Sequence, residues 1–277
     1  MERTVKRLEK RRLADFFSKD EGGGPDVLFA DPAAVAAAVA AGADQELYSA
    51  ARDVLPSRVV PAPEKQDGPT SAGATLWSAD LVIYQDGTLP GGEPFRSTGH
   101  WNPADQLEIF QVLSGRVLML SSILDKPDGQ SSVFFQECRA GDLAVVPFGA
   151  WHLTYVLDGP AMVFNTYSGP IGSRDDATAS GTAHTPATKY RSQRGPAEIT
   201  VTRSDTGFSI DLSAKWRQAC GDPVRVSCPA WLQQHIPLSG LLTDLHVSAT
   251  DADLEALLLS ARTSSGVDLT EAAERWS

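Results

Sequence analysis

The sequence predicts a mainly β fold, a compact antiparallel barrel or sandwich, with a helical arm before it and a helical extension after it. From residue 76 to about residue 168, short runs rich in Val, Ile, Phe, Tyr and Leu alternate with turn signals such as QDGTLPGGEP, KPDGQ and RAGD. The 277 residues with 42% hydrophobic content can bury at least one sizeable core. Helix signals flank this region on both sides, so we divide the chain into an arm and linker (1–70), a β-barrel core (71–170) and an extension packed on the barrel (171–277).

Helix signals dominate the arm. In DPAAVAAAVAAGADQELYSAARDVL, Asp31 is placed to cap a helix that has Pro32 at its first position. The alanine-rich continuation predicts a helix that breaks near Gly42 and resumes as far as Leu55. The basic run RTVKRLEKRR predicts one or two turns of solvated helix, with a nucleic-acid-binding arm as the alternative. The proline-rich segment PSRVVPAPEKQDGPTSAG is typical of a loop or an extended arm.

The extension begins with a long polar loop over residues 169–196. Two strand-like pieces follow it, EITVTR and GFSIDLS. The tail TDADLEALLLSARTSSGVDLTEAAERW is helical in pattern, with Thr250 or Asp251 as the cap and leucines spaced for burial. The loop and the tail are long enough to cover the mouth of a barrel, so we expect substrate specificity to lie there.

Charge and composition limit the partners. The formal net charge of -11 makes nucleic acid and anionic membrane surfaces unfavourable partners. No apolar stretch approaches the roughly 20 residues that a membrane span requires, and the charged start lacks the apolar region of a secretory signal, so we expect a cytoplasmic protein. Cys138, Cys220 and Cys228 lack metal-ligand or redox spacing and are expected to be reduced thiols.

The block GHWNPADQLEIFQVLSGRV is the first that carries chemistry. Alternate residues of a strand share a face, so His100 and Asn102 point the same way, as do Glu108 and Phe110. A turn over residues 103–106 would bring Glu108 back opposite His100. A charged residue in an otherwise apolar strand is costly to bury unless something compensates it, and a divalent cation would do so.

The second block is AGDLAVVPFGAWHLTYV. Residues 141–142 form a turn, residues 143–146 a buried strand, and residues 147–149 a tight bend that delivers the second histidine of interest, His152. On the following strand His152 and Thr154 share a face. The two blocks together predict two histidines and one glutamate inside one barrel.

These blocks resemble the two sequence motifs of the cupin superfamily. In that family the first motif contains HxH, a glutamate and, six residues later, a glycine; the second reads G(X)5PxGxxH(X)3N. The matching residues here are His100, Glu108, Gly115, Gly141, Pro147, Gly149 and His152. More narrowly, both blocks are similar to the cupin-type glucose-6-phosphate isomerases, over about ninety residues or roughly a third of the chain. The resemblance implies a cupin (double-stranded β-helix) barrel.

The resemblance further implies one divalent metal ion, Fe, Mn, Ni or Zn, bound by His100, Glu108 and His152. Two departures matter: Asn102 stands where the family has its second histidine, and Val156 where it has the terminal asparagine. The surviving set of two histidines and one carboxylate is of the kind that binds Fe(II) with open positions. This leaves two alternatives. The amide oxygen of Asn102 is a weak fourth ligand, or the absence of the second histidine marks the loss of metal binding altogether.

Polar residues beside the ligands are candidates for substrate contact. Ser97, Thr98 and Thr154 align with polar positions near the pocket of the isomerases, and Asn102 faces the same site; the alternative is that the hydroxyls are ordinary strand residues.

The function expected from the resemblance is a metal-dependent isomerisation or rearrangement of a small oxygen-rich metabolite, in which the metal polarises a carbonyl and Glu108 ligates or moves a proton. An Fe(II)-dependent cupin oxygenase and a metal-poor, non-catalytic cupin binding protein remain alternatives. We expect a homodimer, because exposed barrel edges commonly pair.

Overall fold

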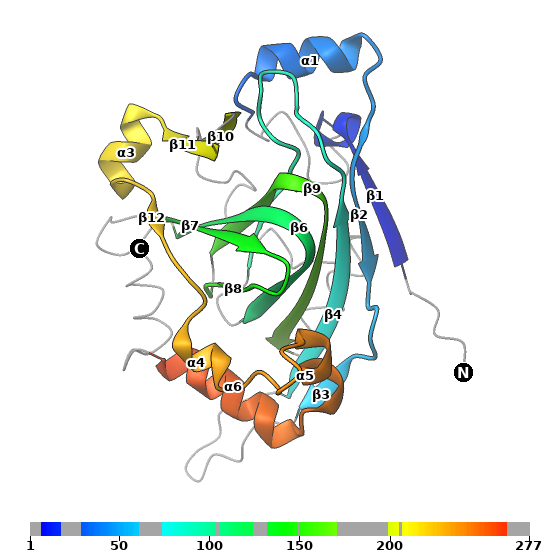
Figure 1. Cartoon of the computed structure of the whole chain (residues 1–277), viewed down its shortest axis with the longest axis vertical. Coiled ribbons are helices and arrows are strands. Elements are labelled where there is room, and N and C mark those ends of the chain that lie inside the picture. Colours follow the sequence, from blue (N-terminus) through cyan, green and yellow to red (C-terminus); the bar gives the residue numbers. More distant parts are fainter. Residues whose placement is uncertain are drawn as a thin grey trace.

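The computed structural model describes residues 7–17, 29–60, 74–102, 106–123, 132–148, 150–170, 199–204 and 207–264. The strands of its main sheet are β1 (Arg7–Arg12), β2 (Glu46–Arg52), β3 (Arg58–Val60), β4 (Thr75–Tyr84), β5 (His100–Trp101), β6 (Glu108–Ile123), β7 (Ser132–Arg139), β8 (Leu143–Val146), β9 (Trp151–Pro170) and β12 (Val224–Arg225). The order is β1-β2-β4-β9-β6-β7-β12, with β3 beside β4, β5 beside β9 and β8 beside β6 (Figure 1). The predicted mainly β class is confirmed.

Two long strands set the shape of the barrel. β6 and β9, of 16 and 20 residues, pair antiparallel from Glu108 opposite Tyr167 to Ser122 opposite Trp151. The first part of β6 also pairs with β8 and its second part with β7, so the sheet curls around an interior (Figure 1). The β6–β9 register shifts between Val112 and Val117, where the ribbon bends, and this brings both halves around the same core.

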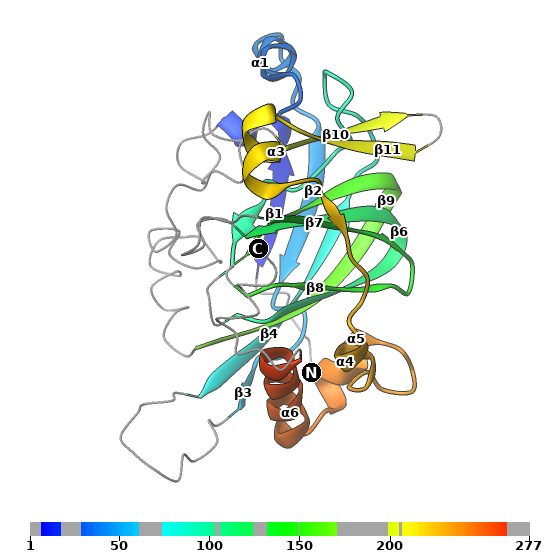
Figure 2. The same cartoon turned by 90° about the vertical axis from the view of Figure 1, so that its left-hand side faces the viewer.

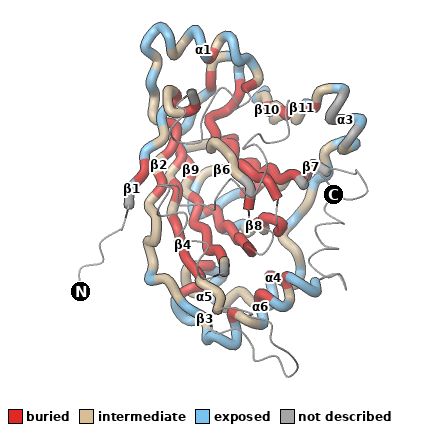
Figure 3. Tube along the Cα trace, turned by 180° about the vertical axis from the view of Figure 1, so that it is seen from behind, coloured by how far each residue is buried: buried red, intermediate tan, exposed pale blue. Residues whose placement is uncertain are grey.

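The curled sheet encloses the largest hydrophobic cluster. Figure 3 shows the buried residues following the central strands β4, β6, β8 and β9. Alternate side chains of these strands point inward, as the period of two requires. Interior members of the cluster include Tyr48, Val82, Tyr84, Phe110, Val112, Val117, Met119, Val146, Val156 and Val163.

Two further clusters cover the outer faces of the sheet. The helices α4 (Ala230–Gln233), α5 (Leu242–Ser248) and α6 (Asp251–Thr263) lie at one end, and the hairpin β10 (Ile199–Ser204) and β11 (Gly207–Leu212) lies toward the other with α3 (Ala214–Cys220) (Figure 2). The helices bury Leu232, Leu242, Leu254 and Leu257 against outward side chains such as Trp77, Ile109 and Phe164. The hairpin buries Ile199, Val201 and Leu212 against Leu118, Leu153 and Tyr155.

The arm differs from the prediction. The segment α1 (Pro32–Ala40) is helical, and Asp31 caps it by accepting a hydrogen bond from the Ala34 backbone at 2.9 Å. The predicted resumption of this helix to Leu55 is wrong, because β2 occupies that sequence and pairs with β1 and β4. The predicted helix in the basic run is likewise wrong, because residues 7–12 form β1. Tertiary pairing, which buries Leu47 and Ala50 completely, outweighs the helix propensity of ELYSAAR.

The extension agrees with the prediction where the structure describes it. Both predicted strands form as the β10–β11 hairpin, and α6 begins after Thr250, whose side chain accepts from the Asp253 backbone in a capping box. Arg58 on β3 ties this end to the barrel through an ion pair with Asp251 at 2.7 Å. Most of the predicted loop over residues 169–196, residues 103–105 of the predicted turn over 103–106, and the tail after residue 264 lie outside the described residues. Within the described ranges, every helix is too short or too polar to span a lipid bilayer.

The first prediction concerns Gly115, which sits in the bend of β6 with φ of 77°. A Cβ at this position would lie 2.8 Å from the Ala161 Cα and from the Asp158 carbonyl oxygen, both of them backbone atoms. We expect Gly115→Ala to destabilise the fold by about 2 kcal/mol or more, because left-handed strain and a backbone clash add. Gly141→Ala is the control, since its φ is 94° but its Cβ would meet nothing within 4 Å. Equal unfolding free energies for the two variants in denaturant titrations would refute the clash.

Candidate metal centre

Two imidazoles meet where the short strand β5 joins the start of β9. His100 and His152 are direct cross-strand partners, and their ring centroids lie 4.2 Å apart with the planes inclined by 67°. The backbone pairing therefore fixes the separation of the two rings. Phe110 packs against His152 with its ring centroid 5.7 Å away, so the imidazole has an apolar neighbour from β6.

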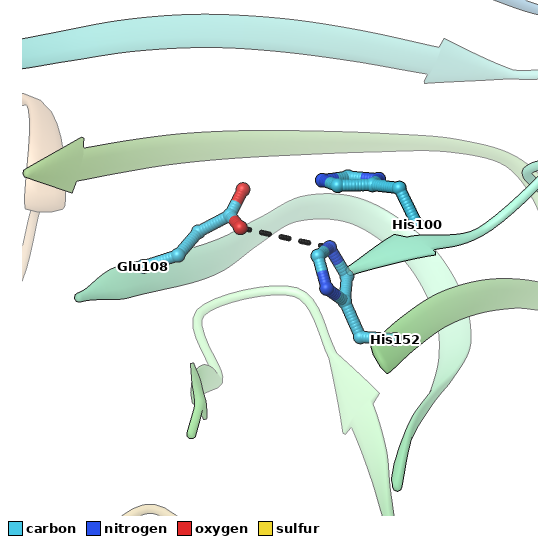
Figure 4. A group of neighbouring side chains, drawn as sticks. All are labelled: His100, Glu108 and His152. Atoms are coloured by element: carbon cyan, nitrogen blue, oxygen red, sulfur yellow. Dashed lines mark ion pairs between the residues drawn. The ribbon is translucent and has the colours of Figure 1, made fainter. Parts of the chain in front are cut away.

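Glu108 completes the cluster from the first position of β6. Its Oε2 lies 3.6 Å from Nε2 of His152, and Figure 4 shows the carboxylate pointing toward both histidines. One ligand atom from each of the three residues lies within 4.8 Å of the others. Donor atoms about 2.1 Å from a common ion lie about 3 to 4 Å apart, so small side-chain rotations would let all three bind one cation. The structure thus brings together the three residues that the sequence predicted.

Three amides hold the Glu108 carboxylate, which is only 1% exposed. Oε1 accepts a hydrogen bond from Asn165 at 2.7 Å, and Oε2 accepts from Asn102 at 2.8 Å and from Gln106 at 3.5 Å. Gln106 also donates to the Oδ1 of Asn102 at 3.1 Å. The carboxylate is therefore fixed in one orientation by donors from three segments of the chain.

This arrangement gives Asn102 a definite role. Its side chain is fully buried, with the nitrogen directed at Glu108 and the oxygen engaged by Gln106. The oxygen that would bind a metal is thus already used as an acceptor. Asn102 does face the site, as the strand pattern predicted, but the geometry favours support of Glu108 over direct ligation.

Burial sets the protonation of the histidines. Removal from water lowers the pKa of His152 to about 3, and removal from water together with the neighbouring His152 lowers the pKa of His100 to about 3. Both rings are therefore neutral at neutral pH. A neutral imidazole has a lone pair available to a metal, so the metal-free site is prepared for binding without proton release from the histidines.

Hydroxyl groups occur close in sequence to both histidines, at Ser97 and Thr98 before His100 and at Thr154 after His152. Thr98 and Tyr48 share a hydrogen bond at 3.4 Å, and Tyr84 shares one with Thr154. The rings of Tyr48 on β2 and Tyr84 on β4 lie 5.5 Å apart, and the Thr154 hydroxyl donates to the sulfur of Met119 at 3.3 Å. Ser97 differs from the other predicted contacts, because its hydroxyl accepts from the Thr154 backbone at 3.0 Å and joins two segments of the barrel.

A second set of charges lies further along the same interior face. Arg52 donates to the Oδ2 of Asp80 at 2.8 Å, and its other Nη lies 3.4 Å from Glu9. Asp80 is fully buried and is the cross-strand partner of Asn165, which binds Glu108. Polar side chains from Arg52 to Glu108 therefore occupy neighbouring positions on this face.

Sequence reasoning missed Asn165, Gln106, Tyr48 and this ion-pair network. One signal was present: Asp80 interrupts the apolar strand WSADLVIY just as Glu108 interrupts its own. Val156, which stands in place of the motif asparagine, is fully buried opposite Val117 and belongs to the apolar core. His246, outside the motifs, is buried and bonds to Thr166 at 2.8 Å, far along the chain from the site.

Comparisons with known proteins give partial likenesses only. No family model and no curated protein matches the chain. Among solved structures, a recombinant oxalate oxidase in complex with glycolate matches 34% of this chain at 20% identity, with a TM-score of 0.27. KdgF from Halomonas sp. matches 36% at 22% identity with a TM-score of 0.24, and the Schizosaccharomyces pombe Cnp3 cupin domain 46% at 10% identity with a TM-score of 0.24.

The matched parts span 42%, 73% and 72% of those three chains respectively. With TM-scores this low, we base no inference about the reaction on these likenesses. The case for a cupin-type barrel rests on this chain's own strands and on the two motif blocks that supply its cluster.

The second prediction tests Asn102 as a support of Glu108. Asn102→Leu keeps the volume but removes the donor to Oε2, so we expect metal affinity to fall about 10–100-fold. In a Glu108→Gln background the same change should have little further effect, because the group that it orients no longer carries charge. Gln136→Leu is the control, since that amide donates to the Leu143 carbonyl away from the site. Additive losses in metal titrations of the double variant would contradict this role.

The third prediction concerns pH. Both site histidines have folded pKa values of about 3, below the unfolded value near 6.5, so the unfolded chain binds more protons between these limits. Stability of the metal-free protein should be fully present above about pH 6.5 and be lost as the pH falls toward 3. Burial also lowers the pKa of His246, which adds to the same trend.

His152→Gln should make that decline shallower by about one proton, as measured by denaturant unfolding between pH 4 and 7 with a chelator present. His235→Gln is the comparison, because this ring bonds to Ser260 outside the cluster. An unchanged slope in His152→Gln would show that His152 is not held neutral in the fold.

Proposed function

We propose that this protein is a metal-dependent enzyme of the cupin type that isomerises or rearranges a small oxygen-rich metabolite. The observation that carries the proposal is the convergence of His100, Glu108 and His152, with their ligand atoms within 4.8 Å of one another. Glu108 is an almost completely buried carboxylate whose described neighbours are neutral amides and imidazoles. Such a charge needs compensation, and a divalent cation in contact with two neutral imidazoles supplies it.

The donor set fits such an ion. Two imidazole nitrogens and one carboxylate oxygen suit Fe, Mn, Ni or Zn, and the set leaves coordination positions open for substrate. When bound, the metal would polarise a carbonyl or a hydroxy-carbonyl unit of the substrate. His100 and His152 would hold it, and the amides on Glu108 would keep the carboxylate in place. Glu108 would also accept or return a proton at Oε2, the oxygen that faces His152.

The substrate contacts that we propose are the hydroxyls beside the imidazoles. Thr98 lies two residues before His100 in the segment that leads into β5, and Thr154 lies two residues after His152 on β9. The Ser97 backbone N–H, next to Thr98, donates to the Thr154 carbonyl at 2.9 Å. With Tyr48, the two threonines offer hydroxyl groups that suit an oxygen-rich ligand. We assign Ser97 and Asn102 to positioning, because Ser97 binds the Thr154 backbone and Asn102 binds Glu108.

An Fe(II)-dependent oxygenase is the second candidate. The observation in its favour is the ligand set itself, because two histidines and one carboxylate with open positions are the facial arrangement of non-haem Fe(II) oxygenases. Asn102 adds to this, since its oxygen is used by Gln106 and leaves the position of a fourth protein ligand open. The two candidates differ in whether turnover consumes oxygen.

The fourth prediction is that His152→Ala removes most of the bound metal, because two donors remain and the site opens. Glu108→Gln keeps the shape of the side chain, so it should weaken metal binding less than it harms turnover. Metal content by elemental analysis after loading with Fe(II), Mn(II), Ni(II) or Zn(II) gives the first measurement. His235→Ala is the control, because His235 bonds to Ser260 outside the cluster. Wild-type metal content in His152→Ala would refute the ligand assignment.

Oxygen electrode measurements on the loaded protein then separate the two candidates. Stoichiometric iron with substrate-dependent oxygen uptake selects the oxygenase, and stoichiometric metal without uptake selects the isomerase. Failure to bind any of the four metals would overturn both and leave a non-catalytic binding protein.

A further inference from the structure

The segment that carries His100 changes face along its length. At its start, Arg96 and Tyr155 form an antiparallel bridge, so these two residues share a face. Further on, His100 pairs with His152, and both rings lie on the side of Glu108 (Figure 4). His152 and Tyr155 are three residues apart on a regularly paired stretch of β9 and therefore face opposite sides. Arg96 and His100 consequently face opposite sides too, although residues four apart on a regular strand would share one.

An extra residue between these two pairings accounts for the change of face. The Ser97 N–H donates to the Thr154 carbonyl at 2.9 Å, so these residues lie opposite each other. Between them and the histidine pair, one strand contains Thr98 and Gly99, and the other contains only Leu153. Two residues opposite one define a β-bulge. The bulge therefore reverses the facing of every residue that follows it in this segment, His100 included.

Gly99 and Ser97 are suited to this bulge. Gly99 has a φ of 75°, in the left-handed region that glycine adopts without strain. A Cβ at this position would lie 2.8 Å from the Trp151 ring and 3.1 Å from the His152 carbonyl oxygen. The hydroxyl of Ser97 accepts from the Thr154 N–H at 3.0 Å, where a regular ladder would use the Ser97 carbonyl. Any other residue at position 99 thus favours the regular register over the bulge.

The Arg96 end of the segment is fixed by its own contacts. The Nε of Arg96 lies 3.0 Å from a carboxylate oxygen of Glu93, and both side chains are buried. The guanidinium carbon lies 5.2 Å from the ring centroid of Phe29 and 5.7 Å from that of Tyr155, within the range of cation–π attraction. Because Arg96 is fixed, loss of the bulge would turn His100 rather than Arg96.

We infer that the bulge at Gly99 is the element that turns His100 into the metal centre, with Gly99 and Ser97 as positioning residues for this ligand. In a regular register, residue 99 would lie opposite His152, and His100 would turn to the face of Arg96. The inference rests on the proposed function, because His100 is a ligand only if the site binds metal. It goes further by stating the register that the site requires and the residue that sets it.

Counting the imidazoles on a probe metal tests this inference in the full chain. One equivalent of Cu(II) is used, because imidazole sites bind it strongly, and pulsed electron paramagnetic resonance counts bound rings through their remote nitrogens. We expect two imidazoles in the wild type, one in His100→Gln and one in Gly99→Val. Gly92→Val is the control and should keep two, since its φ is 89° but its Cβ would meet nothing within 4 Å.

Two further variants distinguish a change of register from general damage to the segment. Deletion of Gly99 removes the extra residue and leaves His100 opposite His152, so two imidazoles should remain although a substitution at the same position loses one. In the His100→Gln background, Gly99→His should restore the second imidazole, because the regular register brings residue 99 opposite His152. Thermal unfolding verifies that each variant is folded. If Gly99→Val does not fold, the deletion and the double variant decide.

The outcomes separate this inference from the proposed function. A wild type that does not bind Cu(II) through two imidazoles overturns the ligand assignment and this inference together. Two imidazoles in the wild type and also in Gly99→Val overturn only the role of the bulge. One imidazole in the deletion variant, or no gain from Gly99→His over His100→Gln alone, would do the same.

Discussion

The carboxylate of Glu108 imposes the constraint on which the centre of this molecule depends, because a nearly inaccessible negative charge must be compensated inside an apolar barrel. Amide groups from three separate segments donate hydrogen bonds to this carboxylate: Asn102 beside β5, Gln106 before β6 and Asn165 on β9. These hydrogen bonds distribute the charge but do not neutralise it. The two neutral imidazoles add no positive charge, so the negative charge of Glu108 stays uncompensated by the cluster itself. That uncompensated charge is the physical basis for proposing a cation there.

The rest of the fold keeps water away from this charge. The curled β6–β9 ribbon forms the wall, and the outer clusters around Trp77 and Leu118 close its two faces with helices and a hairpin. β1 and β2 extend the same sheet and carry Glu9 and Arg52 inward, so the arm supplies charge as well as cover. The same strands therefore provide both packing and buried charge. We expect a substitution in β1 or β2 that removes one of these charges to change the electrostatic potential at Glu108.

The sequence predicted the parts of this arrangement that depend on local pattern. Motif spacing and strand alternation were sufficient to place His100, Glu108 and His152 together, and capping residues located α1 and α6. Local pattern failed at β2, because its alanines and leucine suit a helix and only pairing with β1 and β4 decides otherwise. Alternation also predicts which face Asn102 occupies, but not which atom of its amide meets Glu108. That choice depends on Gln106, whose amide nitrogen donates to the Asn102 oxygen, and sequence spacing does not predict this contact.

The pairing of His100 with His152 has a consequence for how such a site can change over time. Because neighbouring residues of a strand face opposite sides, a one-residue insertion or deletion between Ser97 and Asn102 that leaves the bulge at Gly99 in place would turn His100 outward and bring a neighbour inward. A two-residue change would restore the facing but shift the ring by one pleat. An insertion or deletion of an odd number of residues that keeps this bulge would thus turn His100 away from the site, whereas a substitution at a position other than Gly99 leaves its direction unchanged. Asn102, where the motif that this block resembles has a histidine, is a difference of the permitted kind, since it leaves the length of the strand unchanged.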